Sequence, residues 1–225
     1  MAEQVSITYR LLNEDDIDDV IALLSEHYVT RESTSKCLSM TKEEILSYAD
    51  EIARDAIPQG ISLGAFDDVT NELVGVTFGE CDLYRKPKIK NDNRTPIKIQ
   101  YLQRLYEWFE LIPRIEHGIT SILLADVLAV STQYSNRGIG TELTIRQANL
   151  LADLGFTFLL SFITSEKALA IHAKLGSKCL KKVDMRTYRD SRTGEAVFKH
   201  AELKDNCIQV MCIDLRNLQS IKSKA

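Results

Sequence analysis

The fold is decided by one segment, Val127-Leu-Ala-Val-Ser-Thr-Gln-Tyr-Ser-Asn-Arg-Gly-Ile-Gly-Thr-Glu-Leu143. It reads as an apolar strand, a short polar turn with two glycines, and a helix that begins near Thr141. The start of a helix carries free backbone N–H groups and partial positive charge, so it binds phosphate without needing a lysine. Gly138 and Gly140 have no Cβ, so the backbone there can approach an anion closely. The segment therefore predicts a seat for a phosphorylated cofactor.

The spacing of this loop excludes two familiar phosphate-binding motifs. A dinucleotide fingerprint needs a third glycine three residues after the second, and Leu143 stands at that position. A P-loop needs Gly-Lys-Ser or Gly-Lys-Thr, and neither follows. An ordinary strand-to-helix turn without a ligand remains the alternative interpretation.

Strands and helices alternate along the rest of the chain. Apolar periodicity predicts strands at 6–12, 62–66, 73–83, 122–130, 157–163, 179–188 and 207–214, and helices at 13–28, 41–55, 97–117, 140–154 and 166–175. Residues 29–40 read as a polar connection and residues 84–96 as a charged loop. This order favours an α/β protein with a mixed sheet covered by helices, in one domain spanning residues 1–225.

Composition excludes several classes of function. The chain has 225 residues, 44% apolar and 27% charged, with a net charge of −4 and no basic block, which argues against a nucleic-acid partner. Its five cysteines lack C-x-x-C spacing, so we expect no metal. The longest apolar stretch, 119–130, is interrupted by Ser121 and Asp126 and cannot span a bilayer, and no secretory signal is apparent. A cytoplasmic protein without a membrane partner is expected.

Three segments resemble a known family. Ala129-Val130, followed by Ser135-Asn-Arg-Gly-Ile-Gly140, resembles the coenzyme A motif R/Q-x-x-G-x-G/A of GNAT acyltransferases. Ala170-Ile-His-Ala-Lys-Leu-Gly176 resembles the A-x-x-x-Y-x-K-x-G-F segment of that family, and residues 185–211 resemble the C-terminal half of insect-type arylalkylamine N-acetyltransferases. The resemblance implies the GNAT fold, a mixed and mostly antiparallel twisted sheet of about seven strands flanked by helices, with splayed central parallel strands.

The resemblance also implies a reaction. Acetyl-CoA would be the acyl donor, and the acceptor a primary arylalkylamine such as dopamine, serotonin, octopamine or tryptamine, acetylated by a monomeric enzyme. Two rivals stay open, namely acetylation of a polyamine or protein lysine, and a domain that binds acyl-CoA without turnover. The long segment 84–117 argues against protein substrates, because it would cover the groove that a peptide needs.

The resemblance assigns cofactor binding to Leu128, Ala129, Val130, Ser135, Asn136, Arg137, Gly138, Ile139, Gly140, Thr141 and Ala168. The backbone of Ala129 and Val130 would bind the amide-rich pantetheine as an added strand does. Ser135 stands where the family has arginine or glutamine, so we expect Arg137 to compensate with its charge. Ala168 stands where the family often has a hydroxyl, and it leaves room for the pantetheine arm. Lys174 could meet the 3′-phosphate or simply face solvent.

Acyl transfer to an amine needs an unprotonated nitrogen. An alkylamine with a pKa of about 10.4 costs about 4 kcal/mol to bind as the free base at pH 7, and a carboxylate at the site can take the proton. Glu32, in Arg31-Glu32-Ser33, matches in position the glutamate of the D-E-P segment of the insect subfamily, although aspartate and proline are absent here. A solvated loop glutamate is the other interpretation.

Three further residues are candidates for the chemistry. His172 stands where many GNAT enzymes have a tyrosine that protonates the leaving thiolate, and histidine titrates near neutrality. The alternative is a histidine packed beside the cofactor that transfers no proton. Thr164 and Ser165 follow a predicted strand, where their hydroxyls either orient the thioester and the amine or only cap the next helix.

Overall fold

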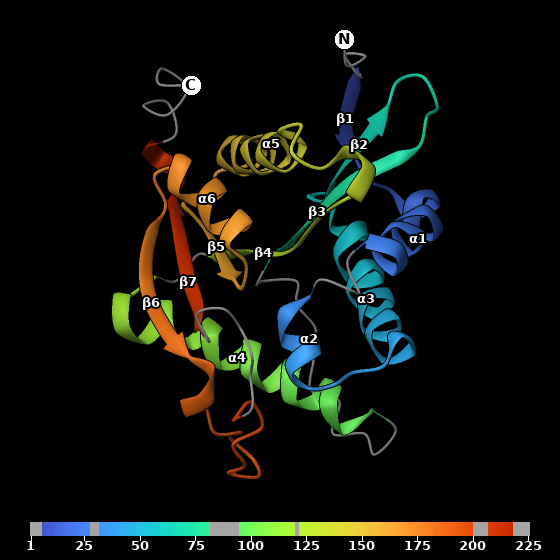
Figure 1. Ribbon diagram of the computed structural model, residues 1–225. Helices are drawn as coiled ribbons and strands as arrows, with labels where there is room; N and C mark the ends of the chain where they lie inside the picture. The colour runs from blue at the N-terminus through green and yellow to red at the C-terminus, as the bar shows by residue number, and fades with distance from the viewer. Residues whose placement is uncertain (1–5, 28–31, 82–94, 120–121, 200–206, 218–225) are drawn as a thin grey trace.

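The computed structural model describes residues 6–27, 32–81, 95–119, 122–199 and 207–217, built around one seven-stranded sheet (Figure 1). The strand order is β1-β2-β3-β4-β5-β7-β6. The strands are β1 (Ile7–Leu11), β2 (Leu63–Asp67), β3 (Leu73–Cys81), β4 (Ile122–Val130), β5 (Phe158–Ile163), β6 (Lys178–Asp184) and β7 (Cys207–Asp214). Only β4 and β5 pair in parallel among these strands, and every other neighbouring pair is antiparallel. The mixed sheet expected from the sequence is therefore confirmed.

In the described part of the chain, six α-helices and several short 3-10 turns connect the strands. They are α1 (Ile17–His27), α2 (Ser33–Cys37), α3 (Lys42–Ala56), α4 (Ile97–His117), α5 (Ile139–Asp153) and α6 (Glu166–Lys174), with turns at Glu14–Asp16, Ile57–Gln59, Thr132–Tyr134, Met185–Thr187 and Leu215–Asn217. Thr41 and Glu44 form the capping box that starts α3, as their spacing predicts. Helix α2 was not predicted, because it lies in the segment 29–40 that reads as a polar connection.

The helices cover both faces of the sheet. Helices α1 and α3 pack against one face of β2–β4 through a cluster that includes Phe66, and α5 packs against the other face beside Ala65. The same alternation continues in β5, where Leu159 packs on α5 and α6 while Phe162 packs on α4. One face therefore carries α1, α3 and α4, and the opposite face carries α5 and α6 (Figure 1).

The two parallel strands separate in the middle of the sheet. Their pairing runs from Ile122–Phe158 to Ala125–Ser161 and stops there, although β4 continues to Val130. A β-bulge accompanies the separation, because β3 advances two residues from Thr77 to Gly79 while β4 advances three from Ala125 to Leu128. An extra residue of this kind bends its strand. The splayed central strands expected from the resemblance are thus present and leave an opening through the sheet.

Some expectations fall on residues outside the described ranges. The charged loop expected at 84–96 lies almost entirely in the segment 82–94, and Arg31 also lies outside. Among the described residues, no helix is long and apolar enough to cross a membrane.

Candidate active site

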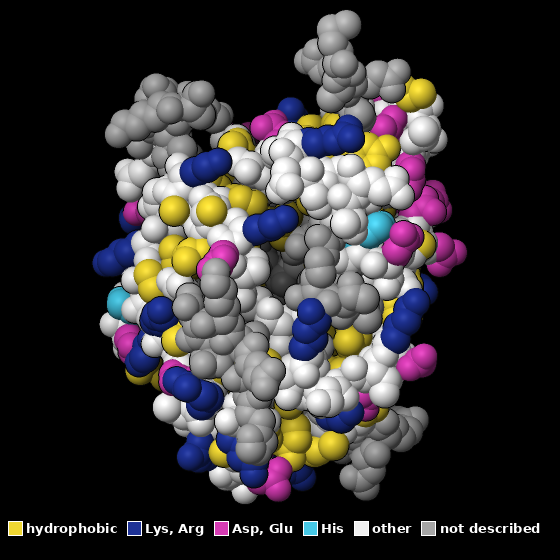
Figure 2. Space-filling model, in the orientation of Figure 1, with side chains coloured by type: hydrophobic (Ala, Val, Ile, Leu, Met, Phe, Trp, Pro, Cys, Tyr) yellow, Lys and Arg dark blue, Asp and Glu magenta, His cyan; other side chains and the backbone are white. Residues whose placement is uncertain are grey.

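A cleft of about 1350 Å³ passes through the opening between β4 and β5. Residues from both faces line it, including Glu32 and Tyr106 on the α4 side and Gly138 and Gly140 on the α5 side. In the view of Figure 2, the molecular surface is hollowed near its middle, with Lys and Arg side chains above and below the hollow. The cleft therefore connects two chemically different compartments across the sheet.

The compartment beside α5 is built from backbone groups. Gly138 precedes α5 with a φ of 84°, Asn136 has a φ of 63°, and no side chain of a described residue caps the helix. The first intrahelical hydrogen bond runs from Glu142 N to Gly138 O at 3.0 Å. The N–H groups of Ile139, Gly140 and Thr141 precede it and are the donors that a helix start offers to an anion. A Cβ on Gly140 would stand 3.5–3.8 Å from side chains of Ile171, Val130 and Leu128, which also line the cleft.

The structure brings the sequence-predicted cofactor residues together. The cleft is lined by Leu128, Ala129, Val130, Ser135, Asn136, Gly138, Ile139, Gly140, Thr141 and Ala168. Arg137 is the predicted residue that does not line it. Its guanidinium lies 5.2 Å from the ring centroid of Tyr134, whose hydroxyl donates to Asp67 at 2.8 Å. Sequence reasoning missed Lys167, which lines the cleft and donates from Nζ to Asn136 Oδ1 at 3.5 Å. The assignment of these residues to cofactor binding remains a prediction.

The start of α6 carries two of the predicted catalytic residues. The Ser165 hydroxyl accepts a hydrogen bond from Ala168 N at 3.2 Å, so it caps the helix. Thr164 and Ser165 both line the cleft. Ser165 therefore has the structural task that the alternative interpretation gave it, and a direct part in catalysis stays a prediction for both residues.

His172 lies in the wall of the cleft and is only 3% exposed. Its Nδ1 lies 2.9 Å from Ser177 Oγ. Burial lowers the pKa of His172 to about 4, because the charged imidazolium loses its hydration. The ring is therefore neutral at pH 7 and holds no extra proton for a leaving thiolate. The proposed acid role remains untested, and the geometry favours the packed, neutral histidine.

Glu32 is a buried residue and not a solvated loop glutamate. It is 8% exposed, precedes α2 as its N-cap, and lines the cleft. Its Oε1 accepts from Thr34 N at 3.0 Å and from Thr34 Oγ1 at 2.8 Å, and its Oε2 accepts from Ser35 N. A carboxylate offers about four lone-pair sites, so these three bonds leave about one, on Oε2, for a further donor. The sequence signal for this cap was present, since Glu32 precedes Ser33-Thr34-Ser35, but the helix was too short to predict.

Tyr106 extends the polar contacts of Glu32 into an aromatic wall. Thr34 has one hydroxyl proton and gives it to Glu32, so the Tyr106 hydroxyl, 3.2 Å from Thr34 Oγ1, is the donor of that pair. The Tyr106 ring stacks on Phe162 with centroids 5.8 Å apart and planes inclined by 22°. Trp108 and Phe109 also belong to α4, but they pack in its core cluster and are not among the described residues that line the cleft. Tyr106 is therefore the aromatic residue of α4 that faces the cleft among the described residues.

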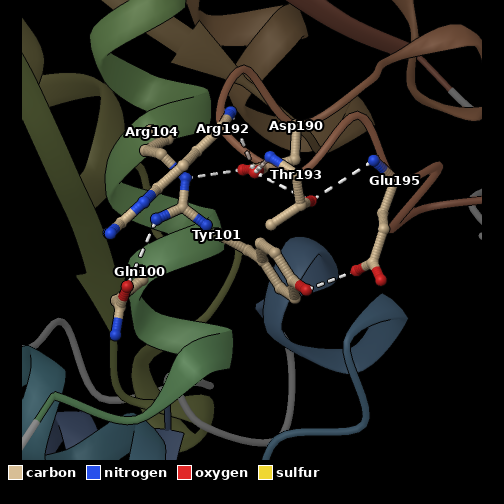
Figure 3. A network of polar contacts seen from close by, with 7 residues as sticks. All are labelled: Gln100, Tyr101, Arg104, Asp190, Arg192, Thr193 and Glu195. Atoms are coloured by element: carbon tan, nitrogen blue, oxygen red, sulfur yellow. Dashed lines mark hydrogen bonds and ion pairs between the residues drawn. The ribbon is translucent and has the colours of Figure 1, made fainter. Parts of the chain in front are cut away.

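A buried ion pair holds α4 in place (Figure 3). Arg104 Nε donates to Asp190 Oδ2 at 2.6 Å, with the side chains 4% and 0% exposed. Burial raises the pKa of Asp190, but the hydrogen bonds from Arg104 and Thr193 outweigh it, and the pKa lies below its usual value. Tyr101 on the same helix donates to Glu195. These contacts join α4, which presents Tyr106 to the cleft, to the segment after β6, and sequence reasoning missed them.

Solved structures show the fold of this chain, although no protein-family model and no curated protein sequence matches it. A mosquito arylalkylamine N-acetyltransferase (like 5b) aligns at 20% identity over 92% of this chain and 99% of its own, with a TM-score of 0.70. The Drosophila melanogaster polyamine N-acetyltransferase, which forms N-acetylagmatine, aligns at 17% identity over 93% and 100%, with a TM-score of 0.74. The NatC complex bound to a Gag peptide and CoA aligns at 13% identity over 93% and 98%, with a TM-score of 0.56. The GNAT fold expected from the sequence is confirmed.

Proposed function

We propose that this protein is an N-acetyltransferase that moves an acetyl group from acetyl-CoA to a primary arylalkylamine. The observation that carries the proposal is the placement of Glu32, buried beside the stacked rings of Tyr106 and Phe162, in the same cleft as the uncapped start of α5. One compartment offers a base and an aromatic wall, and the other offers backbone donors for an anion. The solved neighbours with this fold are named for acetylation of arylalkylamines and of polyamines, and they support acetyl transfer to an amine.

The residues of the α5 compartment fit coenzyme A. The N–H groups at the start of α5 would bind the pyrophosphate, and Lys167 would add a positive charge at the rim. Beyond residue 125, β4 no longer pairs with β5, so its edge would bind the amides of the pantetheine arm as a partner strand would. When bound, acetyl-CoA supplies an acetyl thioester, whose carbonyl carbon is the electrophile.

Glu32 would act on the incoming amine. The ammonium form gives one proton to the spare site on Oε2, directly or through water, and the freed nitrogen pair forms the new N–C bond. The C–S bond breaks, the electron pair leaves on sulfur, and the nitrogen loses its second proton to the departing thiolate or to water as the amide forms. A thiolate has a low enough pKa to leave without prior protonation, so a neutral His172 is compatible with this chemistry. Thr34 and Ser35 hold the Glu32 carboxylate in position.

The lining of the amine compartment favours an aromatic monoamine over a polyamine. Glu32 and Glu166 are the acidic residues among the described residues that line the cleft, and Glu166 belongs to α6 on the other face of the sheet. A polyamine or agmatine carries a second positive charge that needs its own anionic partner once buried. Leu102, Tyr106 and Phe162 instead offer an apolar and aromatic surface.

Turnover of an amine panel tests the proposal. With acetyl-CoA and thiol release as the readout, tryptamine and dopamine should react with a higher kcat/KM than spermidine or agmatine. Glu32→Gln should lower kcat by about 100-fold or more, because proton removal of this kind contributes about 10²–10⁴-fold. CoA should still raise the midpoint of thermal unfolding of this variant.

Glu166→Gln is the matched control, because it neutralises the other described cleft glutamate while Glu32 stays intact. It should retain turnover within a fewfold of the wild type. Preferred turnover of a polyamine would contradict the aromatic substrate class. Stabilisation by CoA with no turnover of any amine would favour a binding protein without catalysis.

A further inference from the structure

One buried polar group in the cleft has no role in the contacts described so far. The Ser161 hydroxyl is 3% exposed, lines the cleft, and has no hydrogen-bond partner among the described residues. An unpartnered buried hydroxyl costs about 1–3 kcal/mol, so a stable protein rarely keeps one without a use. Ser165 and Thr34, two other hydroxyls that line the cleft, already have partners.

The position of Ser161 relates it to the opening in the sheet. Ser161 pairs with Ala125, which is the last paired position before β4 and β5 separate. The loop that leads to α5 begins after Val130, which lies five residues further, or about 16 Å along β4 at about 3.3 Å per residue. Ser161 therefore lies at the closed end of the opening, and the phosphate-binding helix start lies at the open end.

The side chain of Ser161 also lies on a definite face. It shares the face of Leu159, which packs against α5 and α6, whereas Phe162 next to it packs against α4. Ser161 is therefore on the donor side of the sheet, while Tyr106 and Phe162 form the amine side. A long flexible donor anchored at α5 and extended along β4 brings its reactive end to this position.

We propose that Ser161 binds the acyl end of the donor by donating a hydrogen bond to the thioester carbonyl oxygen. This inference rests on the proposed function. A carbonyl oxygen is the acceptor that a hydroxyl prefers, because a thioether-like sulfur accepts only weakly. The bond also strengthens as negative charge develops on that oxygen during attack. Ser161 is then both a binding and a rate-enhancing residue, and it distinguishes acetyl-CoA from free CoA, which lacks the carbonyl.

Ligand affinity measured without amine tests this role. Ser161→Ala should keep or raise the midpoint of thermal unfolding of the free protein, because it removes an unsatisfied buried group. It should leave the affinity for free CoA unchanged and lower the affinity for acetyl-CoA by about three- to tenfold, the loss expected for one neutral hydrogen bond. Ser161→Cys has a similar volume and a weaker donor, so its affinity for acetyl-CoA should fall between those of the wild type and Ser161→Ala.

Ser62→Ala is the matched control. Ser62 is also buried, but its Oγ already accepts from Gly79 N at 3.2 Å, so its loss should destabilise the free protein and leave the ratio of acetyl-CoA to CoA affinity at the wild-type value. An unchanged ratio in Ser161→Ala, with a wild type that binds acetyl-CoA, would overturn the role of Ser161 alone. A wild type that binds neither acetyl-CoA nor CoA would overturn the proposed function, and this inference with it.

Discussion

The role expected for His172 from the sequence differs from the one that its surroundings in the structure favour. In the sequence it stands where many GNAT enzymes have a tyrosine that donates a proton. A histidine there could take that role, because an exposed histidine titrates near pH 6.5. In the structure it is buried in the cleft wall, where burial lowers its pKa to about 4. Residue identity predicts the ordinary pKa, but burial is a property of the whole fold. The ring is therefore neutral under physiological conditions and can only donate or accept a hydrogen bond.

This burial makes stability depend on pH in a defined window. The folded pKa of His172 is about 4 and the unfolded value about 6.5, so the unfolded chain binds the proton more readily. The contribution of the neutral His172 ring to the free energy of unfolding is fully present above pH 6.5 and is lost as the pH falls toward 4. It amounts to about 3 kcal/mol at 1.36 kcal/mol per unit. Urea unfolding at pH 7 and pH 4 should show this loss in the wild type and not in His172→Gln.

An exposed histidine supplies the control for that experiment. His117 lies at the exposed end of α4, so His117→Gln should retain the pH profile of the wild type. A profile of His172→Gln parallel to that of the wild type between pH 4 and pH 7 would contradict the assignment to His172.

For single residues, the sequence predicted which ones line the cleft better than it predicted which side chains they contact. Every predicted cofactor residue except Arg137 lines the cleft, because a strand followed by a glycine turn and a helix fixes the backbone path. Arg137 stacks on Tyr134 instead, a contact that the pattern of the loop does not encode. The donors to Glu32 were also missed, since they depend on a five-residue helix too short to show periodicity.

At the scale of elements, the start of α5 uses two glycines for two different reasons. Gly138 has a φ of 84°, a region that costs an L-residue about 1–2 kcal/mol, and a Cβ there would meet no atom within 4 Å. Gly140 has no such restriction, and its Cβ would contact three apolar side chains at ordinary distances. Backbone conformation explains the first glycine, and under the proposed function space for coenzyme A would explain the second.

The two positions should therefore respond differently to alanine. Gly138→Ala should lower the free energy of unfolding by about 1 kcal/mol. Gly140→Ala should leave the free energy of unfolding unchanged and lower the affinity for CoA by about tenfold or more. The added methyl group would occupy space that the bound ligand needs, whereas its contacts with the protein are at ordinary distances. Chemical denaturation and ligand titration of both variants measure the contrast. Equal CoA affinity in Gly140→Ala and the wild type would remove this glycine from the cofactor site.

The long elements were predictable for a physical reason. Helices such as α3 and α4 and the strands on either side of the cleft repeat their apolar residues with a clear period, and caps such as Thr41 and Gly118 mark their ends. The β-bulge in β4 was not predictable from this chain alone, because the extra residue has no side-chain signature. The splayed strands were expected only through the resemblance to the GNAT family.

At the scale of the whole molecule, the sheet consists of two halves joined by a short parallel seam. The seam has four paired positions, from Ile122–Phe158 to Ala125–Ser161. Helix α4 adds a second connection, because its core cluster contains Leu105 and Phe109 together with Tyr48 from α3 and Val210 from β7. The buried Arg104–Asp190 ion pair joins the same helix to the segment after β6 (Figure 3). The alignment of the two halves therefore depends on how firmly α4 is held.

Breaking this ion pair should destabilise the molecule strongly. Asp190→Asn leaves Arg104 charged and buried without its carboxylate, and removal of one partner of a buried pair costs about 3–5 kcal/mol. Lys181→Gln removes one partner of the half-exposed pair with Glu116 and should cost about 1 kcal/mol or less. Urea unfolding measures both. A loss below about 1 kcal/mol in Asp190→Asn would show that the pair does not hold α4.

The short seam also determines which part of the opening can adjust its width. Any rotation of one half against the other pivots near Ala125 and Ser161, so the displacement grows with distance from that apex. The mouth beside α5 moves most, and the apex scarcely moves at all. If coenzyme A binds as we propose, its headgroup would lie between walls that can close around it, whereas the acyl group would meet a space of nearly fixed size. Under the proposed function, this geometry would favour short acyl chains over long ones.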